Sequence, residues 1–144
     1  MNAQQMWALY AEKETISAGY DAWSFGDDPD TLARLVLSGE KTATSSAYFW
    51  YGLEKEELPK AGEYSVILDS NEEAICIIKT TRVYITPFDH VTEDHARKEG
   101  VGDKSLSYWR KVHEDFFTKE LKEVGLSFRE SMEIVCEEFV RVYP

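Results

Sequence analysis

No apolar run in this sequence approaches the length that a membrane-spanning helix needs. Residues 1–6 also lack the basic and apolar regions of a signal peptide. These two absences predict a cytoplasmic protein without membrane contact. The chain has 144 residues, 43% of them hydrophobic, which is enough to bury a core without stabilising metals or disulfides. Since it contains no repeat, linker or low-complexity segment, we treat residues 1–144 as a single domain.

Cysteine is scarce, and the two cysteines do not form a metal-binding pattern. Cys76 and Cys136 are far apart and belong to no CxxC motif, which argues against a zinc site. Both lie in apolar, strand-like segments and are expected to be buried, reduced thiols. His90 and His95 have no clear third ligand near them in the sequence, so we predict no metal and no cofactor.

Basic residues are also few. The chain has 16 Lys and Arg against 27 Asp and Glu, a formal net charge of −11. Such a charge opposes non-specific binding to long nucleic acids, which depends on accumulated Lys and Arg. A small nucleoside, or a short RNA held by one local patch, remains compatible with it. The oligomeric state is left open.

The hydrophobic pattern predicts helices and strands in an irregular order. Helices are expected over 2–18, 31–38, 91–99 and 106–124, with Asp30 and Ser105 or Asp103 as N-caps. Residues 63–68 and 74–80 form a predicted hairpin, 81–86 prolong its second strand or bend into another, and 131–143 form a closing strand. The order favours an α+β domain, a small antiparallel β-barrel with inserted and flanking helices.

A polar segment follows the second predicted helix. Gly39 is expected to end that helix in a left-handed conformation, which places Lys41 and Thr44 in a turn or at the head of a strand. The segment can form a polar site, or it can be a solvated loop. It is not a nucleotide-binding P-loop, because Glu40 separates the glycine from the lysine and a helix precedes it.

The pattern Gly39-x-Lys41-x-x-Thr44 resembles the signature of the ASCH domain, a family of the PUA-like β-barrel group. Segments 23–26 with 32–36, 92–99, and 100–117 resemble three further parts of the longer bacterial members. Together they span most of residues 23–140, and their order matches.

The resemblance implies a PUA-like barrel with a cleft that meets RNA or a nucleoside. Some short bacterial members hydrolyse the acetyl amide of N4-acetylcytidine with a lysine, a threonine and a glutamate, which map onto Lys41, Thr44 and Glu99. A longer member is described as a ribonuclease. Ser46 departs from the pattern, because many members carry arginine there.

The residues leave the chemistry open. Thr44 needs an adjacent base to act as a nucleophile, and a carboxylate such as Glu99 keeps a nearby lysine charged, so Lys41 and Glu99 could equally form a structural ion pair. The expected ligand-contacting residues are Gly39, Ser46, Trp50, Ser105, Trp109 and His113. Two functions follow: an amidohydrolase acting on an N4-acylated cytidine, or an RNA-binding module or ribonuclease with His113 as its general acid or base. The net charge favours the first, since a nucleoside needs no phosphate neutralisation.

Overall fold

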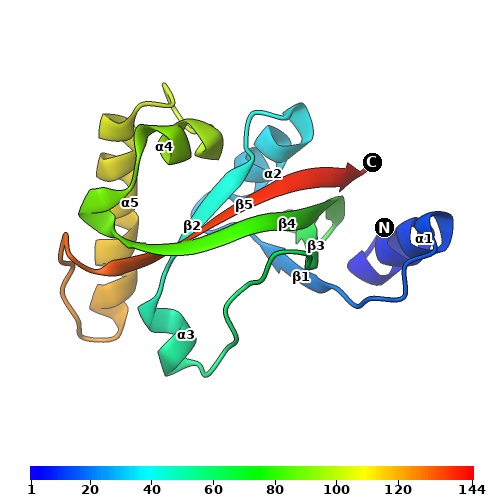
Figure 1. Cartoon of the computed structure of the whole chain (residues 1–144), viewed down its shortest axis with the longest axis horizontal. Coiled ribbons are helices and arrows are strands. Elements are labelled where there is room, and N and C mark those ends of the chain that lie inside the picture. Colours follow the sequence, from blue (N-terminus) through cyan, green and yellow to red (C-terminus); the bar gives the residue numbers. More distant parts are fainter.

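A computed structural model describes all residues 1–144 and shows helices packed on a curved sheet (Figure 1). The helices are α1 (Ala3–Glu14), α2 (Pro29–Ser38), α3 (Phe49–Leu53), α4 (Glu93–Glu99) and α5 (Leu106–Glu123), with a 3-10 turn, η1 (Phe88–His90). The strands are β1 (Asp21–Ser24), β2 (Ala43–Ala47), β3 (Tyr64–Leu68), β4 (Ala74–Pro87) and β5 (Glu133–Tyr143).

The five strands form one half-barrel sheet in the order β1-β3-β4-β5-β2. The predicted antiparallel pairing of 63–86 with 131–143 is confirmed, because β3 pairs with β4 and β4 pairs with β5. Residues 81–86 prolong β4 rather than starting another strand. The α+β, PUA-like fold class is therefore correct. The sheet is nevertheless mixed, because β1 pairs parallel to β3. No strand was predicted for residues 21–24.

The helix ends follow the predicted chemistry with two exceptions. Gly39 adopts φ +85° after α2, as expected for a helix C-cap. Asp28, not Asp30, caps the start of α2 by accepting a hydrogen bond from the Thr31 amide. Asp30 instead holds the β3–β4 turn through Ser70 at 2.8 Å. The first helix ends at Glu14 rather than near residue 18, since Thr15 takes a left-handed conformation.

The core divides into packing clusters on the sheet. Trp7 and Tyr10 of α1 pack on β3 and β4, whereas Leu9 of the same helix is 48% exposed. Trp109 and Phe117 of α5 pack against β5 together with α4. Figure 1 shows α4 and α5 at one end of the sheet and α1 at the other. No helix is long and apolar enough to cross a membrane.

Both cysteines are buried and free, as predicted. Burial raises the pKa of each thiol to about 12, so both remain protonated at neutral pH.

Candidate functional site

Two glycine-dependent turns bring the second and fourth helices together. After Gly39 the chain doubles back, and the Lys41 amide donates to the Leu35 carbonyl. Gly100 ends α4 with φ +75° and lies against the start of β2. A Cβ built on Gly100 would stand 2.3 Å from the Glu40 carbonyl oxygen, so only glycine permits this approach. The contact places Glu99, the last residue of α4, beside Lys41.

Lys41 and Glu99 form a buried ion pair. Lys41 Nζ lies 3.2 Å from Glu99 Oε1, and the two side chains are 2% and 3% exposed. Nζ also donates to the Ala43 carbonyl at 2.8 Å. Both neighbours are acceptors, and Nζ also lies 5.1 Å from the centroid of the Phe25 ring. The third N–H of the ammonium therefore has no oxygen acceptor within the protein.

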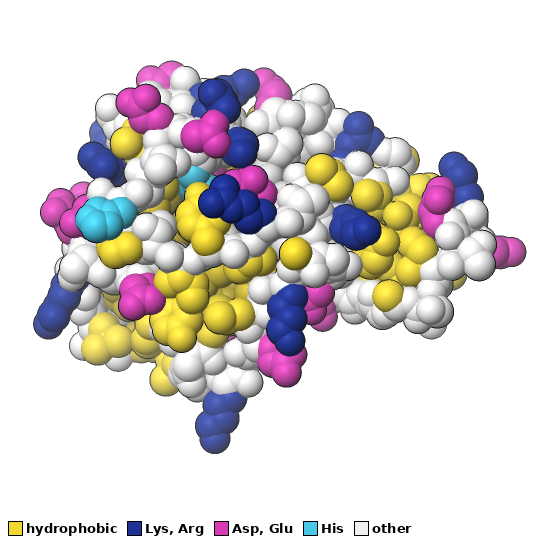
Figure 2. Space-filling model, viewed as in Figure 1, with side chains coloured by type: hydrophobic (Ala, Val, Ile, Leu, Met, Phe, Trp, Pro, Cys, Tyr) yellow, Lys and Arg dark blue, Asp and Glu magenta, His cyan; other side chains and the backbone are white.

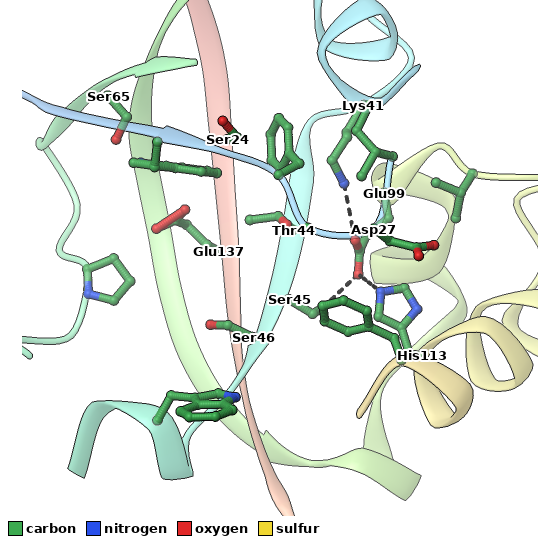
Figure 3. A pocket seen from close by; sticks show the side chains of 18 of the residues that line it. Ser24, Asp27, Lys41, Thr44, Ser45, Ser46, Ser65, Glu99, His113 and Glu137 are labelled. Atoms are coloured by element: carbon green, nitrogen blue, oxygen red, sulfur yellow. Dashed lines mark hydrogen bonds and ion pairs between the residues drawn. The ribbon is translucent and has the colours of Figure 1, made fainter. Parts of the chain in front are cut away.

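Glu99 is the centre of a larger hydrogen-bond network, part of which is visible in Figure 3. Its Oε2 accepts from Ser45 Oγ at 2.6 Å and from the Trp109 indole. His95 Nε2 and His113 Nε2 lie 3.2 and 3.4 Å from the same oxygen. Burial acts to raise the pKa of Glu99, but the charges of His113 and Lys41 and hydrogen bonds from both histidines hold it well below its usual range. Glu99 therefore stays a carboxylate and is a weak base.

Ser45 joins this network to His95. Ser45 Oγ lies 2.7 Å from His95 Nε2. Since the Ser45 hydroxyl donates its proton to Glu99, His95 Nε2 is the donor to Ser45. His95 is only 1% exposed, so this hydrogen bond is buried. The sequence did not predict a contact between His95 and Ser45. No group of three or more His, Cys, Asp or Glu side chains is arranged to hold a metal ion.

A cavity of about 1000 Å³ lies beside this network. Lys41, Thr44 and Glu99 all line it, although 55 residues of sequence separate Thr44 from Glu99. Figure 3 shows Thr44 between the Lys41–Glu99 pair and Glu137. The Thr44 hydroxyl forms no hydrogen bond within the protein, whereas its neighbour Ser45 is bound to Glu99 and His95. Thr44 is therefore the hydroxyl available to a ligand.

Three of the expected ligand contacts also line the cavity. Trp50 and His113 do so, and Ser46 does so with its hydroxyl 2.8 Å from the Tyr51 hydroxyl. Ser46, hydrogen-bonded to Tyr51, thus occupies the position at which many members of the resembled family carry arginine. The cavity gains no positive charge there.

The other three expected contacts lie outside the cavity. Gly39 serves as the α2 C-cap. Ser105 caps α5, because its hydroxyl accepts from the Tyr108 amide. Trp109 is fully buried behind Glu99 and stacks on His113 with ring centroids 4.2 Å apart. The aromatic residues along the cavity are instead Trp23, Phe25, Trp50, Tyr51, Tyr108 and Phe116.

Glu137 is a cavity residue that the sequence reasoning missed. It lies on β5 opposite Thr44 of β2 and is only 8% exposed. No hydrogen bond or cation stabilises its carboxylate, and burial, assisted by the charge of Glu63, raises its pKa to about 7. The sequence offered little signal, because β5 is buried on both faces at residues 134–137 and shows no alternation of buried and exposed positions there.

The rest of the lining is acidic. Lys41 is the only Lys or Arg among the lining residues, and Glu99 already balances its charge. The acidic lining residues are Asp21, Asp27, Asp28, Glu56, Glu57, Glu63, Glu99, Glu120 and Glu137. Such a cavity repels anions and favours neutral or cationic ligands.

The sequence matches the family model described as the ASCH domain over residues 21–143. The chain belongs to the ASCH domain family. Two solved structures agree with this assignment at a TM-score of 0.91 each. The ASCH domain from Lactobacillus crispatus JV V101 is 35% identical, and the match covers 98% of this chain and 94% of that one. Protein EF3133 from Enterococcus faecalis V583 is 39% identical, with 99% and 88% covered.

A more distant structure, the hypothetical protein PH0355, shares the fold alone. It is 17% identical with a TM-score of 0.56, and the match covers 84% of this chain and 99% of that one. No curated protein has significant similarity to the sequence. ASCH membership places the chain in a PUA-like fold of the kind associated with RNA binding. The fold alone does not define the ligand, which depends on the residues that line the cavity.

Proposed function

We propose that this ASCH protein binds a nucleoside in the cavity and hydrolyses the exocyclic amide of an N4-acylated cytidine. The convergence of Lys41, Thr44 and Glu99 carries the proposal: a buried ammonium with a free N–H, an unbound hydroxyl and an orienting carboxylate line one cavity. In the reaction the amide C–N bond breaks, water is consumed, and the products are a carboxylic acid and the free amine.

Lys41 stabilises the negative charge that develops on the substrate during the reaction. Its position is fixed by Glu99 and the Ala43 carbonyl, so the remaining N–H can donate to the acyl oxygen of the substrate. Negative charge develops on that oxygen as the tetrahedral intermediate forms, and a preorganised ammonium in a buried site stabilises it. Glu99 is the positioning residue for this ammonium rather than the base, because its pKa is held low.

Thr44 is the nucleophile in this proposal. Its oxygen forms an ester with the acyl group, and the proton it loses goes, through water, to the departing amine nitrogen. Water then hydrolyses the ester and restores the threonine. The step balances, because the proton lost by the nucleophile is the one gained by the leaving group, and the relaying water is the base that Thr44 needs as it attacks.

The cavity supports a nucleoside better than an RNA strand. Its lining carries one lysine against many carboxylates, and Ser46 adds no charge. Lys and Arg side chains on the face shown in Figure 2 are scattered among acidic ones rather than gathered in a patch. RNA binding remains the second candidate because the PUA-like fold favours it. The ribonuclease form of that candidate would place His113 in the reaction, and His113 does line the cavity.

The test is release of acetate from N4-acetylcytidine by the purified protein. We expect turnover by the wild type and a loss of roughly 100-fold or more in Lys41→Met, as for removal of an oxyanion donor. Lys104→Met is the matched control, since Lys104 pairs with Glu40 on the exposed surface. Wild-type protein that binds a short RNA and releases no acetate would overturn the hydrolase in favour of the RNA-binding candidate.

A further inference from the structure

The cavity has a second polar end at Glu137, away from the Lys41–Glu99 pair (Figure 3). Glu137 and Thr44 are directly paired across β5 and β2, so both side chains project from the same face of the sheet. The neighbouring inward positions of β5 are the buried, apolar Val135 and Phe139. A carboxyl group at this position is not required by the packing of the sheet.

Within the chain, nothing compensates the burial of this carboxyl group. The other buried carboxylate of the site, Glu99, is surrounded by donors, whereas Glu137 has no hydrogen bond and no cation. Its charged neighbour, Glu63, is acidic and makes its ionisation less favourable. The Glu137 oxygens face the cavity and have no partner within the protein, so they are free to accept hydrogen bonds from a ligand that enters it.

We propose that Glu137 is a substrate-binding residue that accepts hydrogen bonds from the part of the ligand remote from the scissile amide. This inference rests on the proposed nucleoside function. The shared chemistry is a pair of O–H or N–H donors on an uncharged ligand, which a carboxyl group can accept with both oxygens. In a cytidine, such donors come from the ribose hydroxyls, because the only N–H donors of the base are at N4, the site of the scissile amide.

The arrangement of the cavity is consistent with a ligand that spans both ends. Thr44 lies between Glu137 and Lys41, so a ligand whose acyl group meets Lys41 and Thr44 extends toward Glu137. Trp23 and Trp50 also line the cavity and provide flat surfaces for a base. The carboxylates of Glu56, Glu57 and Glu63 line the same cavity, so an anionic group is not favoured there.

The test measures dissociation constants by calorimetry for cytidine, 2′-deoxycytidine and cytosine with wild type, Glu137→Gln and Glu133→Gln. Glu133 is the matched control because it is an exposed carboxylate on the same strand, β5, and does not line the cavity. We expect Glu137→Gln to weaken cytidine binding by roughly ten- to hundred-fold, as for a lost hydrogen bond to a charged group, and Glu133→Gln to leave it unchanged. Thermal unfolding verifies that both variants remain folded.

The ligand series identifies the donors. If the ribose supplies them, wild type prefers cytidine over 2′-deoxycytidine and Glu137→Gln loses that preference. If the variant instead weakens all three ligands equally, Glu137 contacts the base at N4, and the inference of a contact remote from the scissile amide is overturned. Equal binding of every ligand by wild type and Glu137→Gln would overturn the inference and leave the proposed hydrolysis standing. Failure of the wild type to bind any of the three would overturn both.

Discussion

At the residue scale, Lys41 and Glu99 depend on each other. Each charge is almost completely buried, and removing one leaves the other without its partner. We expect Lys41→Met to lower the free energy of unfolding by roughly 3–5 kcal/mol, the usual cost of breaking a buried pair. Urea denaturation monitored by circular dichroism measures this change.

The double variant Lys41→Met with Glu99→Gln is the control for that prediction. It removes both charges while the Gln amide oxygen still accepts from Ser45 and Trp109. Most of the lost stability should return. A single variant as stable as wild type would show that the pair contributes little and that Glu99 is compensated by the histidines alone.

Glu137 gives a second prediction at this scale, on pH. Its pKa rises from 4.5 to about 7 on folding, so the folded state binds this proton more tightly than the unfolded state. Below pH 4.5 the group costs nothing, and the penalty grows as the pH rises through about 7, reaching roughly 3 kcal/mol. Glu137→Gln should therefore be more stable than wild type at pH 8 and similar to it near pH 4.5.

Thermal unfolding of the two proteins across this range tests the sign. The other ionisable groups that line the cavity are Asp21, Asp27, Asp28, Lys41, Tyr51, Glu56, Glu57, Glu63, Glu99, Tyr108, His113 and Glu120. They are present in both proteins, so their effects cancel in the difference between variant and wild type, except for that of Glu63, whose charge acts on Glu137. A difference that shrinks as the pH rises would mean that a neighbouring cation stabilises the Glu137 carboxylate.

At the element scale, the contact between the end of α4 and the start of β2 positions the ion pair. Gly100→Ala introduces a Cβ against the Glu40 carbonyl and must displace one element from the other. Gly125→Ala is the matched control, since Gly125 has a similar φ of +76° and no atom within 4 Å of its Cβ position. We expect the control to lose about 1–2 kcal/mol from backbone strain, and Gly100→Ala to lose clearly more.

Activity separates the two glycine variants further. Because Gly100→Ala moves Glu99 away from Lys41, acetate release from N4-acetylcytidine should fall far below that of Gly125→Ala. Equal stability and equal activity of the two variants would contradict the role assigned to this contact.

The elements that sequence predicts well are those set by local chemistry. The Gly39 cap, the Ser105 cap of α5 and the β3–β4 hairpin follow from residues within a few positions of each other. The parallel pairing of β1 with β3 does not, because residues 21–24 become a strand only through a partner 44 positions away. Propensity within such a short segment cannot show a tertiary partner.

The candidate site shows the same difference between residues that local sequence predicts and residues that only the fold reveals. Motif resemblance pointed to Lys41, Thr44 and Glu99, and the structure brings all three to one cavity. Trp109 was an expected ligand contact, and only the fold shows that its indole donates to Glu99 and is fully buried. Glu137 could not be found from sequence, because β5 is buried on both faces there and the pairing of Glu137 with Thr44 depends on the sheet register.

At the scale of the whole molecule, charge decides the class of ligand. The net charge of −11 and the acidic cavity both oppose phosphate. We expect cytidine to bind with little dependence on salt, and cytidine 5′-monophosphate to bind at least several-fold more weakly, with the difference decreasing at high salt. Titration at two ionic strengths measures this, and tighter binding of the phosphorylated ligand at low salt would refute it.

The measurement that tests the central claim most directly compares Thr44→Ala with Ser45→Ala in acetate release from N4-acetylcytidine. The two hydroxyls are adjacent in β2, but only the Thr44 hydroxyl is free of protein hydrogen bonds. If Thr44 is the nucleophile held beside the Lys41 ammonium, Thr44→Ala should lose activity by on the order of a thousand-fold or more, while Ser45→Ala retains most of it. Thr44→Ala turning over at the wild-type rate would contradict the account.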